Sequence, residues 1–106
     1  MADVEAETLE IPPEDIVEER YYTVPLRSVR YRPRKKRAAV AVRKIVQFIV
    51  RHMKPKNEEG EIDPRLVKIH PRLNELIWRR GIEKPPLKVR VRAVRTREGT
   101  IWLFPA

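Results

Sequence analysis

The feature that most constrains this chain is a long amphipathic stretch at residues 33–54, PRKKRAAVAVRKIVQFIVRHMK. Its apolar side chains recur at the i, i+3, i+4, i+7 spacing that places them along one side of an α-helix. That side consists of Ala38, Ala41, Val42, Ile45, Phe48, Ile49, His52 and Met53. The opposite side carries six cations and no anion: Lys36, Arg37, Arg43, Lys44, Arg51 and Lys54. We therefore expect a helix that buries one side in a core and presents a basic side outward.

The single sign of charge on the outer side predicts a negatively charged partner. Exposed helix faces normally mix positive and negative residues. The whole chain has a net charge of +9, but residues 20–106 contain all 24 Lys and Arg residues and only seven acids, a balance of +17. A compact body with this charge repels itself unless a polyanion neutralises it. Arginine, which outnumbers lysine here, also donates paired hydrogen bonds to phosphate. These properties favour RNA as the partner.

Length and composition exclude several classes of protein. A chain of 106 residues is the size of one domain. Cysteine is absent, which excludes disulfides and thiolate metal sites and agrees with a reducing cytosol. No apolar run is long enough to cross a membrane, and no signal-peptide pattern is present. We expect a cytoplasmic protein without a membrane partner.

The first 19 residues differ from the rest of the chain. Residues 1–19 hold eight acids, no Lys or Arg and no aromatic residue, and they include the Pro12-Pro13 pair. This composition is typical of a disordered tail, so we expect the folded domain to span residues 20–106. Two roles for the tail remain open: a solubilising extension, or an acidic arm that shields the basic body or contacts a basic neighbour.

The remaining pattern predicts a small mixed fold. Residues 20–30 alternate as a strand, and Pro25 places that strand at a sheet edge. A short strand at 66–69 precedes a second helix at 71–80, with His70 as a weak N-cap and Gly81 after its end. Residues 87–95 alternate again and form a hairpin with 100–104, one face buried and one basic. The order β-α-β-α-β-β indicates an α+β domain with two layers.

The sequence offers no catalytic or metal site. It has no glycine-rich phosphate loop and no nucleophile motif around its sole serine, Ser28. His52 and His70 lack a third ligand at metal spacing, and the acidic residues at 58–63 are typical of a solvated loop. We expect no catalytic residue, metal or cofactor.

The basic residues that we expect to bind RNA fall into two groups from distant parts of the chain. The first group surrounds the long helix: Arg30, Arg32, Arg34, Lys35, Lys36, Arg37, Arg43, Lys44 and Arg51. The second group begins in the last turn of the second helix and continues into the strand after it: Arg79, Arg80, Lys84, Lys88, Arg90, Arg92 and Arg95. Six aromatic residues could stack on unpaired bases, although each by itself is more typical of packing, Trp78 especially: Tyr21, Tyr22, Tyr31, Trp78, Trp102 and Phe104.

Three segments together resemble a known family. They are RYYTVPLR at 20–27, PRKKRA at 33–38, and LNELIWRRGIEKPP at 73–86 followed by VRVRAV. In this order they resemble the thirty-first protein of the large ribosomal subunit of archaea and eukaryotes. The resemblance covers residues 20–106 and implies a structural component of that subunit. It also implies binding to large-subunit rRNA near the mouth of the peptide exit tunnel, beside neighbouring ribosomal proteins, at a rim where nascent-chain factors dock.

The resemblance also carries residues over and shows departures. The family's basic residues correspond to Arg34, Lys35, Lys36, Arg37, Arg79, Arg80, Lys84, Arg90 and Arg92. The usual Asp-Pro before LNE is here His70-Pro71, the loop before the second strand is longer, and the acidic tail is extended.

Two other functions compete with that of a ribosomal protein. A DNA-binding transcriptional regulator could use two helices and a basic strand as a winged module, and an enzyme would need a catalytic constellation that is absent.

Overall fold

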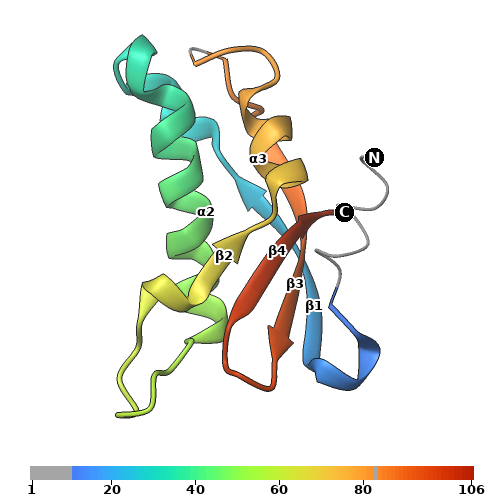
Figure 1. Ribbon diagram of the computed structural model, residues 1–106. Helices are drawn as coiled ribbons and strands as arrows, with labels where there is room; N and C mark the ends of the chain where they lie inside the picture. The colour runs from blue at the N-terminus through green and yellow to red at the C-terminus, as the bar shows by residue number, and fades with distance from the viewer. Residues whose placement is uncertain (1–10, 83) are drawn as a thin grey trace.

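A computed structural model describes residues 11–82 and 84–106 (Figure 1). Four strands form one sheet: β1 Ile16–Pro25, β2 Val67–Ile69, β3 Lys88–Thr96 and β4 Ile101–Pro105. There are two α-helices, α2 Arg37–Met53 and α3 Pro71–Trp78. There are also four short 3-10 turns: η1 Pro13–Asp15, η2 Arg27–Tyr31, η3 Arg34–Lys36 and η4 Pro64–Leu66. The α+β class is confirmed.

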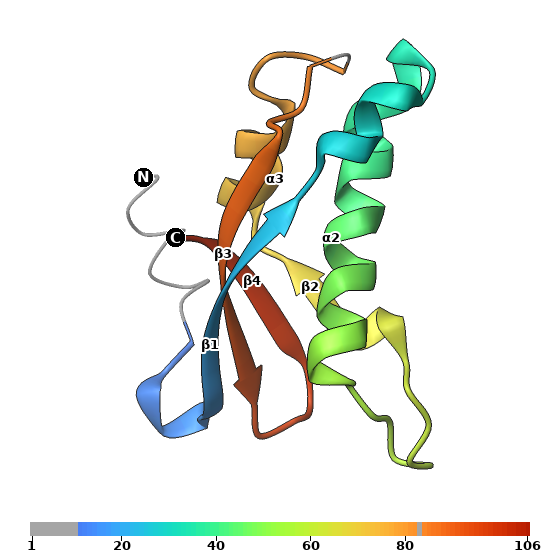
Figure 2. The same cartoon turned by 180° about the vertical axis from the view of Figure 1, so that it is seen from behind.

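The sheet has the strand order β1-β3-β4-β2. β1 pairs with β3 and β3 with β4 in antiparallel fashion, whereas β2 and β4 run parallel. Since paired residues share a face of the sheet, Val24 and Tyr22 lie beside Val89 and Val91 on the face that the helices cover. Figure 2 shows the other side of the molecule, with β1 along one edge.

The long helix packs as its periodicity predicts. The buried residues of α2 are Ala38, Ala41, Ile45, Ile49 and Met53. They join Leu73 and Ile77 of α3 and the inner residues of the sheet in one core. α2 begins at Arg37, later than expected, because residues 34–36 form a 3-10 turn. It ends before Pro55, with Lys54 in a left-handed conformation (φ 46°).

The first strand corrects the expected boundaries. β1 begins at Ile16, so four residues assigned to the tail belong to the sheet, where Ile16 pairs with Thr96 and Glu19 with Val94. An ion pair of 3.0 Å between Glu19 and Arg92 explains the attraction of this acidic segment to a basic strand. Residues 11–15 of the expected tail precede β1 and include η1, and residues 1–10 lie outside the described residues.

The end of β1 agrees with the pattern only in part. Pro25 is the last residue of this edge strand, as expected from its missing N–H. The chain then turns into η2 instead of continuing as a strand to Arg30, and this turn buries Val29. The η2 turn packs against α2, and the end of β1 lies beside the middle of that helix, near Lys44 and Phe48.

The second helix begins as expected and ends early. His70 is 4% exposed and caps α3, since its Nδ1 accepts a hydrogen bond of 3.1 Å from the Arg72 N–H. The helix ends at Trp78 rather than Arg80. Gly81 then reverses the chain at φ 92°, and its N–H donates to the Trp78 carbonyl at 2.8 Å.

Candidate nucleic-acid interface

Two segments far apart in the sequence meet at one end of the molecule. The Ala38 N–H, in the first turn of α2, donates a hydrogen bond of 3.0 Å to the Ile82 carbonyl. The Leu26 N–H, just before η2, donates one of 2.7 Å to the Leu87 carbonyl. These bonds fasten the segments 79–82 and 84–87, which lie between α3 and β3, to the first turn of α2 and to the residue after β1 (Figure 1). Arg30 and Arg37 of the first expected group therefore lie close to Arg80 and Lys84 of the second, and we call this end of the molecule the basic end.

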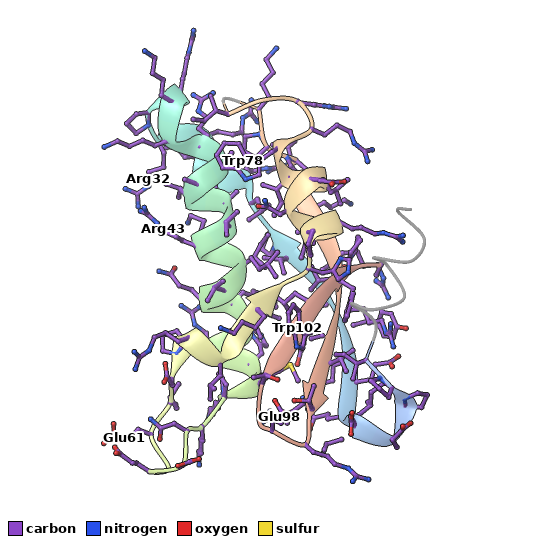
Figure 3. All side chains as sticks on the ribbon, viewed as in Figure 1. Arg32, Arg43, Glu61, Trp78, Glu98 and Trp102 are labelled. Carbon is purple, nitrogen blue, oxygen red and sulfur yellow. The ribbon has the colours of Figure 1, made fainter. Side chains whose placement is uncertain are left out.

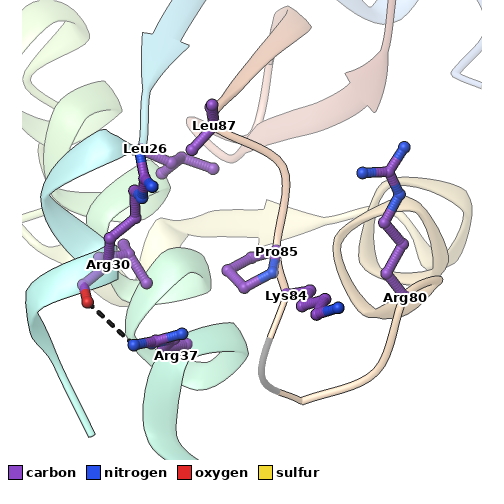
Figure 4. A pocket seen from close by; sticks show the side chains of 8 residues that line it. Leu26, Arg30, Arg37, Arg80, Lys84, Pro85 and Leu87 are labelled. Atoms are coloured by element: carbon purple, nitrogen blue, oxygen red, sulfur yellow. Dashed lines mark hydrogen bonds between the residues drawn. The ribbon is translucent and has the colours of Figure 1, made fainter. Parts of the chain in front are cut away.

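A pocket of about 270 Å³ lies at this meeting point (Figure 4). Four cations line it together with four apolar residues: Arg30, Arg37, Arg80, Lys84, Leu26, Val29, Pro85 and Leu87. Figure 4 shows Arg30 and Arg37 on one side and Arg80 on the other, with Lys84 and Pro85 between them. No acidic residue lines the pocket within the described part of the chain, and Glu83 lies outside that part. We call it the cationic pocket.

Arg37 fixes the geometry of one wall of the cationic pocket. Its Nε donates a hydrogen bond of 3.1 Å to the Arg32 carbonyl, and its Nη2 donates one of 3.0 Å to the Arg30 carbonyl. Both acceptors belong to the backbone at η2 and just beyond it. Arg37 therefore holds the backbone of the η2 turn, including that of Arg30, against α2, a positioning role that the sequence pattern does not reveal.

The start of α2 concentrates positive charge. Arg34, Lys35 and Lys36 are exposed in η3, immediately before the helix, and the first turn of α2 contains no acid. The helix dipole already adds partial positive charge at this terminus, where cations are unfavourable and anions are favourable. A phosphate at this end would relieve both effects.

The basic surface continues along the outer side of α2. Arg43 and Arg51 are exposed and Lys44 is half-buried. Arg32 and Arg43 extend outward on the same side of the molecule (Figure 3). A second, shallower hollow of about 180 Å³ is lined by Val24, Pro25, Lys44, Gln47, Phe48 and Arg51. The basic surface therefore reaches from the α2 start to the edge strand.

The sheet face away from the helices is basic over only part of its length. The Arg90 guanidinium lies 5.9 Å from the centre of the Tyr21 ring and 3.5 Å from Thr23 Oγ1. Arg92 is partly neutralised by Glu19 and lies 5.5 Å from the centre of the Phe104 ring. Farther along this face Val94 is fully buried, which corrects the expectation of an entirely basic face.

The charge of Glu19 is stabilised on this face. Hydrogen bonds from Arg92 and then from the Tyr21 hydroxyl hold the pKa of the Glu19 carboxyl below its ordinary value. Arg92 is thus engaged within the protein, whereas Lys88 and Arg90 are exposed. We expect the latter two to be more available to an anion than Arg92.

Residues 11–82 and 84–106 contain neither a metal cluster nor a membrane-spanning helix. No group of three or more His, Cys, Asp or Glu side chains is placed to hold a metal ion there. None of the helices in that part combines the length and the apolar character needed to span a bilayer.

Comparison with known proteins identifies the family. The model of the family described as "Ribosomal protein L31e" matches residues 17–100, most of the chain. This chain belongs to the ribosomal protein L31e family. Proteins named "Large ribosomal subunit protein eL31" from Methanopyrus kandleri and Methanocaldococcus jannaschii are each 49% identical to it, covering 82% and 81% of this chain and 91% and 87% of their own lengths. One from Pyrobaculum neutrophilum is 41% identical over 80% of this chain and 86% of its own length.

Membership of the L31e family settles two expectations. The family resemblance is confirmed, and the chain is a ribosomal structural protein and not an enzyme. The match begins at residue 17, one position after β1 begins, so the family's shared region includes part of the segment expected to be a tail.

The fold of this L31e family member separates Arg95 from the other candidate residues. Alternation along β3 places Arg95 on the same face as Val91 and Ala93, which is the helix face. Its Nη2 donates a hydrogen bond to the Met53 carbonyl at the end of α2. Its Nε is buried and has no partner within the described residues. Arg95 is therefore engaged inside the fold, away from the cationic pocket.

The aromatic residues divide into packed and exposed sets. Tyr22 packs against Phe48 and His52, with ring centres 5.6 and 5.4 Å apart, and Phe104 lies 4.9 Å from the His70 ring. Trp78, expected to pack in the core or at its edge, is 37% exposed and lies between α2 and α3 near the basic end (Figure 3). Trp78 is the last residue of α3, and the buried residues of that helix are Leu73 and Ile77.

Proposed function

We propose that the chain is a structural constituent of the large ribosomal subunit that binds large-subunit rRNA through the basic end of the molecule. The relatives are named as proteins of the large ribosomal subunit, and the chain is similar to them over most of its length. The observation that carries the proposal is the junction of Ala38 with Ile82, which joins two cationic segments from distant parts of the sequence. One folded RNA can contact both segments.

The chemistry of this end supports backbone recognition of RNA. Phosphate contacts by Lys and Arg supply affinity and orientation without reading base sequence. We assign these contacts at the basic end to Arg30, Arg32, Arg34, Lys35, Lys36, Arg79, Arg80 and Lys84, and beyond it to Arg43, Lys44 and Arg51 of α2 and to Lys88 and Arg90 of β3. Arg37 and Arg92 take part from positions held by contacts within the protein.

The family resemblance supports a finer location. On that basis we place the protein on the cytoplasmic ribosome near the mouth of the peptide exit tunnel, beside neighbouring ribosomal proteins and within reach of nascent-chain factors. Membership of a ribosomal protein family speaks against the alternative of a DNA-binding transcriptional regulator.

The test is the salt dependence of binding to large-subunit rRNA fragments. One variant carries Arg34→Gln, Lys35→Gln and Lys36→Gln, and a second carries Arg79→Gln, Arg80→Gln and Lys84→Gln. Removing one phosphate-binding cation should reduce the slope of log affinity against log salt by roughly 0.7 to 0.9. Arg37 is left unchanged because it holds the η2 turn.

A control variant that loses the same charge elsewhere tests whether the position of the cations matters or only the net charge of the protein. Lys56, Arg65 and Arg97 are exposed and belong to the loop and turn segments at the other end of the molecule (Figure 1). Changing all three to Gln removes the same charge and should leave the slope closer to that of the wild type. Equal slopes for the wild type and the two basic-end variants, with the variants folded, would contradict the proposal.

A further inference from the structure

The cationic pocket has a composition that phosphate binding alone does not require. The accessible apolar part of its wall is formed by Leu87, which is 50% exposed, and by half-buried Pro85, whereas Leu26 and Val29 are each only 1% exposed. A phosphate interacts with charged groups and gains nothing from an apolar wall. A ligand that matches both parts has an apolar face and an anionic group, which is the chemistry of a nucleotide.

The cations of the pocket are available to such a ligand. Within residues 11–82 and 84–106, no hydrogen bond or ion pair holds the side chains of Arg30, Arg80 or Lys84. Arg37, by contrast, is bonded to the backbone and keeps the wall in place. A guanidinium group can bind a phosphate through two parallel hydrogen bonds, and it can also stack on an unpaired base.

The volume of the pocket limits the ligand to a small one. At about 270 Å³ it lies just below the roughly 300 Å³ at which pockets for drug-sized molecules begin. A stacked RNA helix would remain at the rim, since its bases face one another and not the protein. A single base turned out of its stack can enter.

Exposed apolar residues mark the same end of the molecule. Seven large apolar side chains are exposed in the described part of the chain, and three of them come from the segments that form the pocket: Tyr31, Ile82 and Leu87. Proteins that bind unpaired bases stack them on aromatic side chains, and Tyr31 offers such a ring, while Ile82 and Leu87 offer apolar contact.

We propose that the cationic pocket holds one unstacked nucleotide of the rRNA. The base lies against Pro85 and Leu87, and the phosphate is bound by Arg30, Arg80 and Lys84. This inference rests on the proposed function and adds to it the site and the kind of RNA element that is recognised.

The first test is a titration of the isotope-labelled full chain, followed by NMR. The probes are adenosine 5′-monophosphate, uridine 5′-monophosphate, adenosine, inorganic phosphate and tetraglutamate. The nucleotides should shift the methyl signals of Leu26, Val29 and Leu87, whereas inorganic phosphate should shift only the arginine side-chain signals. Nucleotide shifts identical to those of phosphate would overturn the proposal, and methyl shifts with tetraglutamate as large as with nucleotides would instead assign the pocket to an acidic peptide.

The second test uses a neutral substitution in the pocket. Leu87→Ser removes apolar contact and no charge, so affinity for the rRNA fragment should fall roughly five- to tenfold while the salt slope stays unchanged. Ile62→Ser is the matched control, because Ile62 is 48% exposed and outside the pocket. Melting curves of both variants verify that they are folded.

The two tests separate this inference from the function on which it rests. If Leu87→Ser binds as tightly as the wild type while the basic-end variants still flatten the salt slope, the nucleotide site is wrong and RNA binding at this end stands. If the basic-end variants also retain the wild-type slope, the proposed function fails together with the nucleotide site.

Discussion

The guanidinium of Arg95 donates a hydrogen bond to the main-chain carbonyl of Met53, the last residue of α2. The last carbonyls of a helix have no partner within the helix and carry partial negative charge. A cation from β3 therefore satisfies the end of α2 and ties the helix to the sheet.

Replacing Arg95 should lower stability and leave RNA binding intact. We expect Arg95→Leu to reduce the free energy of unfolding by about 1–3 kcal/mol, because the variant cannot make the charged hydrogen bond to the helix end. Urea unfolding measures this change. The salt slope for rRNA should remain that of the wild type, whereas Arg90→Gln should flatten it. If Arg95→Leu kept the wild-type stability and flattened the slope of log affinity against log salt, Arg95 would instead belong to the RNA-binding surface.

The two faces of α2 should respond differently to a new carboxylate. Ile45 is fully buried, so Ile45→Asp should cost several kcal/mol of stability, at the upper end of single substitutions. Gln47 is exposed, and Gln47→Asp should change stability by less than about 1 kcal/mol. Thermal or urea unfolding of both variants decides. Similar losses for the two would mean that the buried side of the helix is misassigned.

The Glu19 carboxyl should titrate below its ordinary pKa of 4.5. Hydrogen bonds from Arg92 and Tyr21 favour the ionised form in the folded chain, so this stabilisation is present above the ordinary pKa and is lost as pH falls through the lowered value. Arg92→Gln should raise the Glu19 pKa toward 4.5. Carbon NMR of the side-chain carboxyl against pH measures it. An unchanged pKa in that variant would exclude Arg92 as the main cause.

Two truncations of different length should show how much the first residues of β1 add to the stability of the fold. Removing residues 1–19 deletes the first four residues of β1 and the ion pair of Glu19 with Arg92. We expect a lower melting temperature than for a chain that lacks only residues 1–12, by roughly 4–8 °C for each kcal/mol of stability removed. Equal melting temperatures for the two truncations would show that this end of β1 adds nothing to stability.

Periodic patterns allowed much of the fold to be predicted. The buried side of α2 and the alternation of Val89, Val91 and Ala93 follow directly from the spacing of apolar residues. Pro25 at an edge and His70 as a cap also follow from local chemistry. These features depend on neighbours in the sequence, and a single sequence contains that information.

Features that depend on distant partners could not be predicted. Arg95 finds its acceptor 42 residues away, at Met53, and in the sequence it resembles the neighbouring arginines of β3. Glu18 and Glu19 resemble an acidic tail until β3 is placed beside them. The two cationic groups were expected to be neighbours, but the pocket between them depends on the η2 turn that Arg37 holds.

The order of strands in the sheet has a consequence for how the chain is made. β1 pairs with β3, and β2 pairs with β4, so each partner is synthesised well after the strand that needs it. Such non-local pairing delays folding because distant segments must be brought together first. While a ribosome synthesises the chain, the apolar side of α2 has no complete sheet to cover it until β3 and β4 have emerged. The domain therefore completes its fold only once β4 has left the ribosome, and a chain interrupted before Ile101 would leave β2 without its partner.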